Sequence, residues 1–258
     1  MDVLIKEPCE LLDKQFYDII NNRDVVIVGP AAYLEGSGFG RKIDEKQVVV
    51  RINRSFETSE KIPEDVGSRT DILYSCLLET KRNAGVLDFE KIKKSGTLMI
   101  CAPGFKRTFA QYPDGLYCTH PEIQGSTWKK IKNSGYEIRV AFESVDTLLK
   151  KETQTRPNTG FLAIFDILAC QPKSLTIHGF TFYLDGFIKG SKAGVEKEKN
   201  CTEEEFALMA LNSKRHKQEN MWRFAKEHLL NAGNVILDDT MKKILSLENF
   251  SRSEFQKK

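Results

Sequence analysis

The sequence predicts an α/β fold in which a mostly parallel sheet lies between two layers of helices. Short apolar runs alternate with helical patterns throughout the 258 residues, as in chains that build a parallel sheet. Most of these runs are continuously apolar, which is typical of strands buried on both faces. Because no internal repeat or linker divides the chain, we expect a single domain over residues 1–258.

The first half of the chain is expected to hold four strands and two helices. The strands are the apolar runs 25–28, 48–51, 71–76 and 97–102. The helices cover the N-terminal segment 3–22 and the shorter segment 87–94. The polar, turn-rich stretch 55–70 and the aromatic, basic stretch 105–122 predict loops.

The second half continues the alternation. Its strands are expected at residues 136–141, 175–180 and 235–237. Its helices are expected at 128–133, 143–151, 161–170, 203–231 (with a break near 212–213) and 239–247. The glycine-rich, charged stretch before residue 205 is long enough for a mobile lid, and the polar end, 248–258, predicts a flexible tail.

Composition and charge exclude several classes of protein. The net charge of +3 is too small to indicate nucleic-acid binding, and the lysines near residue 200 are interleaved with glutamates. No apolar run approaches the ~20 residues of a membrane span, and the N-terminus lacks the pattern of a signal peptide. The six cysteines are scattered without CxxC or zinc-ligand spacing, so we expect reduced thiols and a cytoplasmic protein.

The first stretch with chemical meaning is Asp24 to Arg54. A buried strand ends at Gly29, and the next ends in a polar cluster with Asn53 and Arg54. In open α/β folds, phosphates and nucleotides bind at this edge of the sheet. The glycines at 36, 38 and 40 fit neither a dinucleotide fingerprint nor a P-loop. They form either a ligand site or a simple connection, and the residues alone favour neither.

The second stretch is RPNTGF, Arg156 to Phe161. Asn158 or Thr159 can cap the apolar helix that follows, and Gly160 permits close approach. Free N–H groups and the positive end of the helix dipole would then face an anion. The plainer interpretation is an N-capped buried helix without a ligand.

The third stretch pairs His216 with Glu219. We expect His216 in the first turn of an amphipathic helix, where the dipole keeps the imidazole neutral and able to take a proton. Glu219 comes three residues later and could orient the ring. The alternative is a solvent-exposed pair. Of the other histidines, His120 is a competing candidate, whereas His178 reads as a core residue and His228 as a surface residue.

Taken together and in this order, the three stretches resemble the sialyltransferase family, glycosyltransferase family 29. The family's long motif resembles VVIVGPAAYLEGSGFG followed by VVVRINR. Its short motif resembles RPNTGFLAIFDIL with LTIHGF, and its very short motif resembles the pair His216 and Glu219. The match covers roughly residues 24–231 in pieces, and the combined pattern is more specific than any one part.

The resemblance implies a Rossmann-like α/β/α domain, a variant of the GT-A arrangement, that acts as an inverting glycosyltransferase without a metal or other cofactor. The donor would be a CMP-activated acidic 2-keto sugar, sialic acid or Kdo, and the acceptor a glycan or glycolipid hydroxyl. His216 would be the general base, with Glu219 beside it. The residues that would hold the donor are Gly29, Pro30, Ala31, Asn53, Arg54, Asn158, Thr159, Gly160, Gly179, Phe180 and Tyr183.

The sequence also departs from the family pattern. Pro30 replaces the usual Asn after the first Gly, which removes one side-chain contact to the nucleotide. Tyr183 lies where the family's third motif has a histidine–tyrosine pair, and that histidine is missing. Cys170 lacks the partner near Asp24 that would form the disulfide of the animal enzymes. These departures motivate a second hypothesis, a catalytically inactive nucleotide- or sugar-binding module of the same fold. Acceptor contacts are expected in the loops 103–122 and 184–202.

Overall fold

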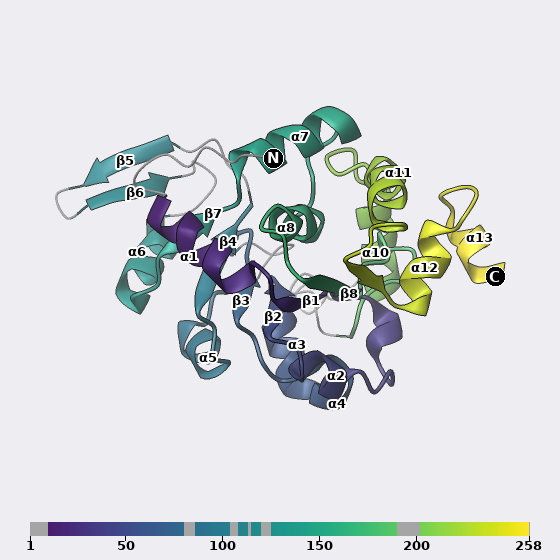
Figure 1. Cartoon of the computed structure of the whole chain (residues 1–258), viewed down its shortest axis with the longest axis horizontal. Helices are drawn as coiled ribbons and strands as arrows, with labels where there is room; N and C mark the ends of the chain where they lie inside the picture. Colours follow the sequence, from purple (N-terminus) through teal and green to yellow (C-terminus); the bar gives the residue numbers. More distant parts are fainter. Residues whose placement is uncertain are drawn as a thin grey trace.

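The computed structural model describes residues 10–79, 86–103, 108–112, 115–119, 125–189 and 202–257. Its centre is a seven-stranded sheet in the order β7-β4-β3-β2-β1-β8-β9 (Figure 1). Every neighbouring pair in this sheet is parallel. The strands are β1 (Asp24–Val28), β2 (Val48–Ile52), β3 (Ile72–Tyr74), β4 (Met99–Ala102), β7 (Ile138–Val140), β8 (Ser174–His178) and β9 (Val235–Leu237). All seven predicted strands and the mostly parallel sheet are therefore confirmed.

Helices cover both faces of this sheet (Figure 1). They are α1 (Glu10–Ile20), α2 (Gly40–Asp44), α3 (Ser55–Lys61), α4 (Pro63–Val66), α5 (Phe89–Lys94), α6 (Gly125–Ser134), α7 (Glu143–Thr153), α8 (Thr159–Leu168), α10 (Glu203–Leu211), α11 (Gln218–Leu229), α12 (Asp239–Leu245) and α13 (Arg252–Lys257). The helix predicted over 203–231 is interrupted between α10 and α11, as expected.

The alternation of side chains along β1 explains the two layers. Val25 and Ile27 belong to a hydrophobic cluster with residues of α1, α7, α8, α11 and α12. Val26 and Val28 point the other way, into a second cluster with Leu34 and residues of α2 and α4. Because successive residues of a strand face opposite sides, a run of four apolar residues packs against both layers at once.

Three segments differ from the sequence prediction. The stretch 55–70, expected to be a loop, forms α3 and α4. Residues of this stretch stabilise the helix starts locally. The hydroxyl of Ser55 accepts a hydrogen bond from the Ile52 N–H. Pro63 is the first residue of α4, a position that proline favours. Phe56 and Val66 supply the buried contacts. Since most residues of this stretch are polar, hydrophobic periodicity alone did not reveal the helices.

The other two differences concern a hairpin and the end of the chain. Within the predicted loop 105–122, the strands β5 (Thr108–Tyr112) and β6 (Gly115–Thr119) pair in antiparallel fashion. The expected flexible tail contains α13, and Phe255 packs against the main hydrophobic cluster. The core of the predicted lid, residues 190–201, lies outside the described residues.

Candidate active site

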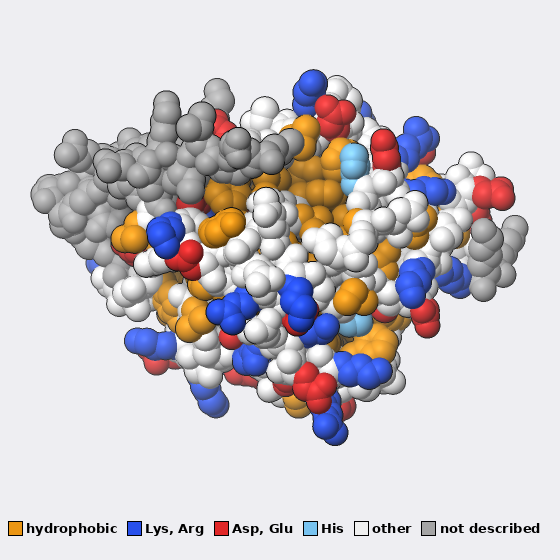
Figure 2. Space-filling model, in the orientation of Figure 1, with side chains coloured by type: hydrophobic (Ala, Val, Ile, Leu, Met, Phe, Trp, Pro, Cys, Tyr) orange, Lys and Arg blue, Asp and Glu red, His pale blue; other side chains and the backbone are white. Residues whose placement is uncertain are grey.

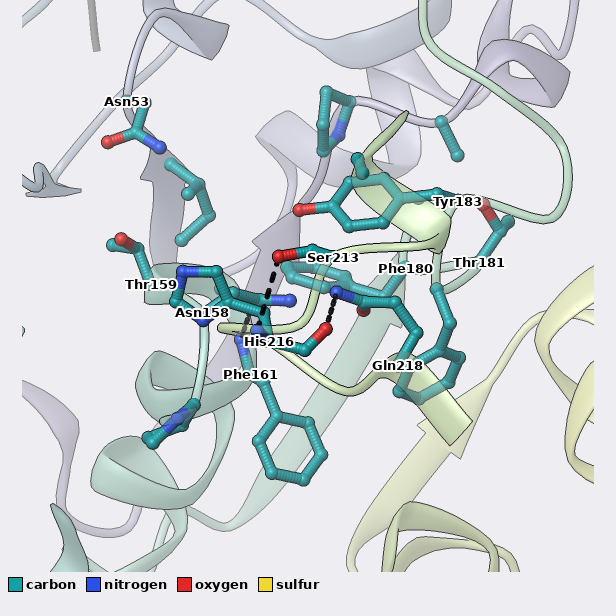
Figure 3. A pocket seen from close by; sticks show the side chains of 18 of the residues that line it. Asn53, Asn158, Thr159, Phe161, Phe180, Thr181, Tyr183, Ser213, His216 and Gln218 are labelled. Atoms are coloured by element: carbon teal, nitrogen blue, oxygen red, sulfur yellow. Dashed lines mark hydrogen bonds between the residues drawn. The ribbon is translucent and has the colours of Figure 1, made fainter. Parts of the chain in front are cut away.

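A cavity of about 260 Å³ opens at the carboxyl ends of the strands. It lies where β1, β2 and β8 end, at the point where the strand order reverses. Ten of the thirteen predicted site residues line it: Pro30, Ala31, Asn53, Asn158, Thr159, Gly160, Gly179, Phe180, Tyr183 and His216. The structure thus brings all three sequence stretches to one place, while Gly29, Arg54 and Glu219 lie outside the lining (Figure 3).

The start of α8 presents backbone donors to this cavity. Asn158 is the N-cap, and its Oδ1 accepts a hydrogen bond from the Phe161 N–H at 2.9 Å. The preceding N–H groups of Thr159 and Gly160 have no acceptor inside the helix. Both residues line the cavity. The positive end of the helix dipole and two N–H groups therefore face whatever occupies it.

Asn53 lies on the other side of the cavity, directly after β2. Its backbone has a φ of 51°, in the left-handed region that asparagine tolerates better than most residues. Its Oδ1 accepts a hydrogen bond from the Cys76 N–H at 3.0 Å. This bond fixes the orientation of the amide, so the Nδ2 group is the end that can donate to a ligand.

His216 is held by a backbone carbonyl. Its Nδ1 lies 2.7 Å from the carbonyl oxygen of Arg156. A carbonyl can only accept, so Nδ1 carries the proton and Nε2 keeps its lone pair. Burial lowers the pKa of the imidazole below its ordinary value of 6.5, and the charges of Arg156 and Arg215 lower it further. The bond to the Arg156 carbonyl acts in the opposite direction. The ring is therefore neutral at neutral pH and suited to accept a proton.

Glu219 does not orient this ring, so that prediction is wrong. Its carboxylate is half exposed and pairs with Arg223 at 2.6 Å, one turn along α11. His216 also precedes α11, which begins at Gln218, instead of lying in its first turn. The backbone before α11 is held by Ser213, whose Oγ accepts a hydrogen bond from the His216 N–H at 3.3 Å.

Arg54, Gly29 and the glycine cluster act outside the lining. The Arg54 guanidinium forms an ion pair with Glu57 on α3. Gly29 packs beneath the cavity wall, against Gly179. Beyond β1, the N–H groups of Gly36 and Gly38 both donate to the carboxylate of Asp65, at 2.7 and 2.9 Å. The glycine cluster is therefore a structural connection, which settles the alternative that the sequence left open.

Tyr183 and Phe180 form part of the wall that follows β8. The hydroxyl of Tyr183 points into the cavity (Figure 3). Burial raises the pKa of this phenol to about 12, so it remains a neutral donor. The ring of Phe180 lies against Gly160, where a Cβ atom would approach its Cε1 to 2.5 Å. Glycine at position 160 therefore allows the end of β8 to pack on the start of α8.

Sequence reasoning missed several residues of the lining. Arg156 and Arg215 bring positive charge, Gln218 is a buried amide, and Phe187 and Phe206 form an aromatic contact with ring centroids 5.8 Å apart. Arg156 belongs to a stretch that the sequence singled out, so its charge was an available signal. Arg215 and Gln218 flank His216 in the third stretch, so their polarity was available too, whereas Phe187 and Phe206 come from segments with no recognisable motif.

His178 is a satisfied core residue, as predicted. Its Nδ1 lies 2.8 Å from Asp238 Oδ2, and its ring stacks on Phe39. The same carboxylate accepts a hydrogen bond from the Tyr33 hydroxyl, which in turn accepts one from the Gly179 N–H at 2.7 Å. Burial alone would raise the pKa of Asp238, but the bonds from His178 and Tyr33 hold it below its ordinary value. This cluster supports the Gly179 turn from behind.

The remaining predictions concern cysteines, charge and membrane. Cys76, Cys101 and Cys170 are free thiols. Acidic and basic side chains are interspersed on the face shown in Figure 2. Among the described residues, no group of three or more His, Cys, Asp or Glu side chains could hold a metal ion. No helix of the described chain combines the length and the apolar character needed to cross a membrane.

Solved sialyltransferase structures are similar to this chain at low identity. A mammalian sialyltransferase in complex with Gal-beta-1-3GalNAc-ortho-nitrophenol is 15% identical, with a TM-score of 0.46, and the match covers 90% of this chain and 79% of that chain. The sialyltransferase CstII from Campylobacter jejuni, in complex with the substrate analogue CMP-3FNeuAc, is 14% identical, with a TM-score of 0.43 and coverages of 80% and 77%. No curated protein sequence matches the chain.

A family model gives the decisive comparison. Residues 13–184 match glycosyltransferase family 29, the sialyltransferases. The matched segment runs from α1 to the turn after β8, so it includes the strand ends and the α8 turn that build most of the cavity. The chain belongs to glycosyltransferase family 29, the sialyltransferase family.

Proposed function

We propose that the chain is an inverting, metal-independent glycosyltransferase that uses a CMP-activated acidic 2-keto sugar, sialic acid or Kdo, as its donor. The acceptor is a hydroxyl of a glycan or glycolipid. The observation that carries this proposal is that a neutral histidine and an open helix N-terminus line the same cavity. Membership of the sialyltransferase family supports the class of reaction.

In this proposal, the leaving phosphate binds at the start of α8. The N–H groups of Thr159 and Gly160 can donate to phosphate oxygens, and the helix dipole favours negative charge there. Arg156 and Arg215 add positive charge to the same lining. CMP leaves as a phosphate monoester, with less charge than a nucleoside diphosphate, so these donors can take the place of a metal ion. We assign Asn53 Nδ2 as a donor to the nucleotide, because its Oδ1 is already engaged by the Cys76 N–H.

His216 supplies the proton transfer. The acceptor oxygen attacks the anomeric carbon, C2, from the side opposite the phosphate, while the bond between C2 and the phosphate oxygen breaks. The hydroxyl proton passes to Nε2 of His216, whose Nδ1–H is held by the Arg156 carbonyl. One displacement from the opposite side inverts the configuration at C2. Positioning matters most, because the transition state resembles an oxocarbenium ion.

The test is a comparison of His216→Ala with His228→Ala. His228 is an exposed histidine on α11 and gives a matched control. We expect His216→Ala to lose roughly 10²- to 10⁴-fold in transfer, to fold normally and to bind CMP, while His228→Ala stays near the parent. CMP release in the presence of an acceptor measures transfer. Near-parental transfer by His216→Ala would remove His216 from its proposed role.

Two further measurements examine the finer parts of the proposal. Transfer should persist after prolonged treatment with EDTA, and loss that added Mg²⁺ or Mn²⁺ restores would refute metal independence. Proton NMR of the first product formed should show the inverted anomer. A retained configuration would instead demand a covalent intermediate.

The second candidate function is a binding module without turnover. Pro30 lines the cavity at the position where the family has an asparagine, so one amide contact to the nucleotide is replaced by a rigid ring. CMP-sialic acid and CMP-Kdo, each offered with a panel of glycan acceptors, separate the two functions. Firm CMP binding without CMP release from any combination would favour the binding module.

A further inference from the structure

Gln218, the first residue of α11, carries an acceptor atom that its protein neighbours leave unused. The residue is 2% exposed, and its Nε2 donates to the carbonyl oxygen of His216 at 2.8 Å. At the other end of the amide, the buried Oε1 has no hydrogen-bond partner within the described residues. Burying an acceptor without a partner costs free energy, so an occupant that donates to it is favoured.

The location of Gln218 Oε1 distinguishes it from the other buried side-chain atoms that lack a hydrogen-bond partner. Three more buried side-chain atoms lack a partner in the described part of the chain, on Arg51, Thr176 and Arg252. None of those three residues lines the cavity, whereas Gln218 does. Figure 3 shows its side chain next to His216, joined by a hydrogen bond. Gln218 is therefore the one of these four residues that belongs to the wall of the cavity.

The chemistry of the atom restricts that ligand. An amide oxygen accepts hydrogen bonds, so it requires an N–H or O–H group and disfavours a phosphate or a carboxylate. The hydrogen bond from Nε2 to His216 fixes which end of the amide is the acceptor. The matching group is thus a neutral donor and not the phosphate or the carboxylate of a CMP-sugar.

The burial of Gln218 Oε1 indicates that the group donating to it belongs to the transferred sugar. An acceptor glycan reaches His216 from solvent and extends outward, so its contacts fall on the open side of the cavity. Gln218 Oε1 is enclosed, which suits a group held inside the cavity, as the transferred sugar would be. The nucleotide is assigned to Asn53, which follows β2 across the cavity.

We propose that Gln218 binds the transferred sugar, with Oε1 accepting a hydrogen bond from a ring hydroxyl or an acylamino N–H. This inference rests on the proposed function, because it takes the ligand to be a CMP-sugar. Sialic acid carries an acylamino group at C5 where Kdo carries a hydroxyl, so both sugars present a neutral donor. Which of the two groups is used decides which donor the site prefers.

The experiment measures binding to Gln218→Met, a variant of similar length that cannot hydrogen bond. The ligands are CMP, the inert analogue CMP-3FNeuAc, and CMP-Kdo, each followed by calorimetry. We expect the affinity for CMP to change less than about twofold and the affinity for at least one CMP-sugar to fall roughly ten- to a hundredfold. A loss confined to CMP-3FNeuAc identifies the acylamino N–H, and a similar loss for both sugars identifies a hydroxyl.

Two controls make the outcome decisive. Gln47→Met removes an exposed glutamine that accepts a hydrogen bond from Asp24 outside the cavity, and it should leave all three affinities unchanged. Gln218→Asn keeps the amide but withdraws it by one methylene, so it provides a milder variant if Gln218→Met does not fold. Equal losses for CMP and CMP-sugars, or no loss at all, would overturn the proposal. If the unmutated protein bound CMP-sugars but released no CMP, the proposed catalysis would be contradicted. The assignment of Gln218 to the transferred sugar would still stand.

Discussion

Gly29 and Gly179 pack backbone against backbone at the carboxyl ends of β1 and β8. A Cβ atom on Gly179 would approach the carbonyl oxygen of Gly29 to 2.6 Å, and one on Gly29 would overlap the carbonyl oxygen of Gly179. The Gly29 N–H also donates to the carbonyl of His178 at 2.8 Å. These two glycines come from different sequence motifs, and their contact joins the motifs at the floor of the site.

Replacing Gly29 with alanine should therefore destabilise the protein. The added methyl group meets backbone atoms that cannot move independently, so we expect a loss of roughly 1–3 kcal/mol in the free energy of unfolding. Gly233→Ala is the matched control, because no atom lies within 4 Å of a Cβ built there and its φ is unstrained. Denaturant unfolding measures both variants. Equal stability of the two would show that the turns separate more easily than their geometry indicates.

The pH dependence of the reaction should report the environment of His216. Because burial and two arginines lower the pKa of its imidazole below 6.5, kcat/KM should rise with pH to a plateau whose acid midpoint lies below that value. Removing a nearby positive charge favours the protonated ring, so Arg215→Gln should move the midpoint to higher pH. The exposed neighbour Lys214→Gln is the control. A midpoint that stays in place or falls in Arg215→Gln would contradict this electrostatic coupling.

Tyr33→Phe should weaken the support behind the cavity wall. It leaves the Gly179 N–H without its acceptor and removes one donor to Asp238. An unsatisfied buried donor costs about 1–3 kcal/mol, and a looser Gly179 turn should also raise the KM for the CMP-sugar. Thermal unfolding and steady-state kinetics measure the two effects. Tyr17→Phe, on the exposed side of α1, should change neither, and a similar response in both variants would argue against a specific role for Tyr33.

A buried ion network that joins β7 to α1 and α8 should control stability, although none of its three residues lines the cavity. Arg139 donates to Asp13 at 2.7 Å and to Asp166 at 2.6 Å, and all three side chains are almost fully buried. Arg139→Met would leave both carboxylates without this partner, at a cost of roughly 3–5 kcal/mol. The solvent-exposed pair of Lys173 and Asp24 provides the control, since Lys173→Met should have little effect. Denaturant midpoints that shift equally would refute the difference between buried and exposed pairs.

The sequence predicted the sheet well because its strands are continuously apolar. Hydrophobic runs such as Val25–Val28 carry their own signal, and the glycines and prolines that follow them mark the ends. The same reasoning failed for α3 and α4, whose polar residues face local partners and whose burial depends on Phe56 and Val66. Short helices held by tertiary contacts leave little periodicity to read.

The site was predictable where chemistry is concentrated in a motif and not where it depends on packing. The Asn158 turn combines cap, glycine and helix start within three residues, so its role was visible in the sequence. Glu219 was misassigned because spacing alone places it near His216, whereas its carboxylate turns toward Arg223. The actual partner of the His216 ring is the backbone carbonyl of Arg156. Because every residue carries a backbone carbonyl, no sequence pattern could predict this contact.

The position of β1 between β2 and β8 has a consequence for synthesis on the ribosome. β2 follows within a few dozen residues, but β8 emerges roughly 150 residues after β1, which takes about 8–30 s at ordinary translation rates. During that time one edge of an apolar strand has no native neighbour and can pair with another growing chain. The strand that anchors the cavity is thus also the one most exposed to misassociation before the fold is complete.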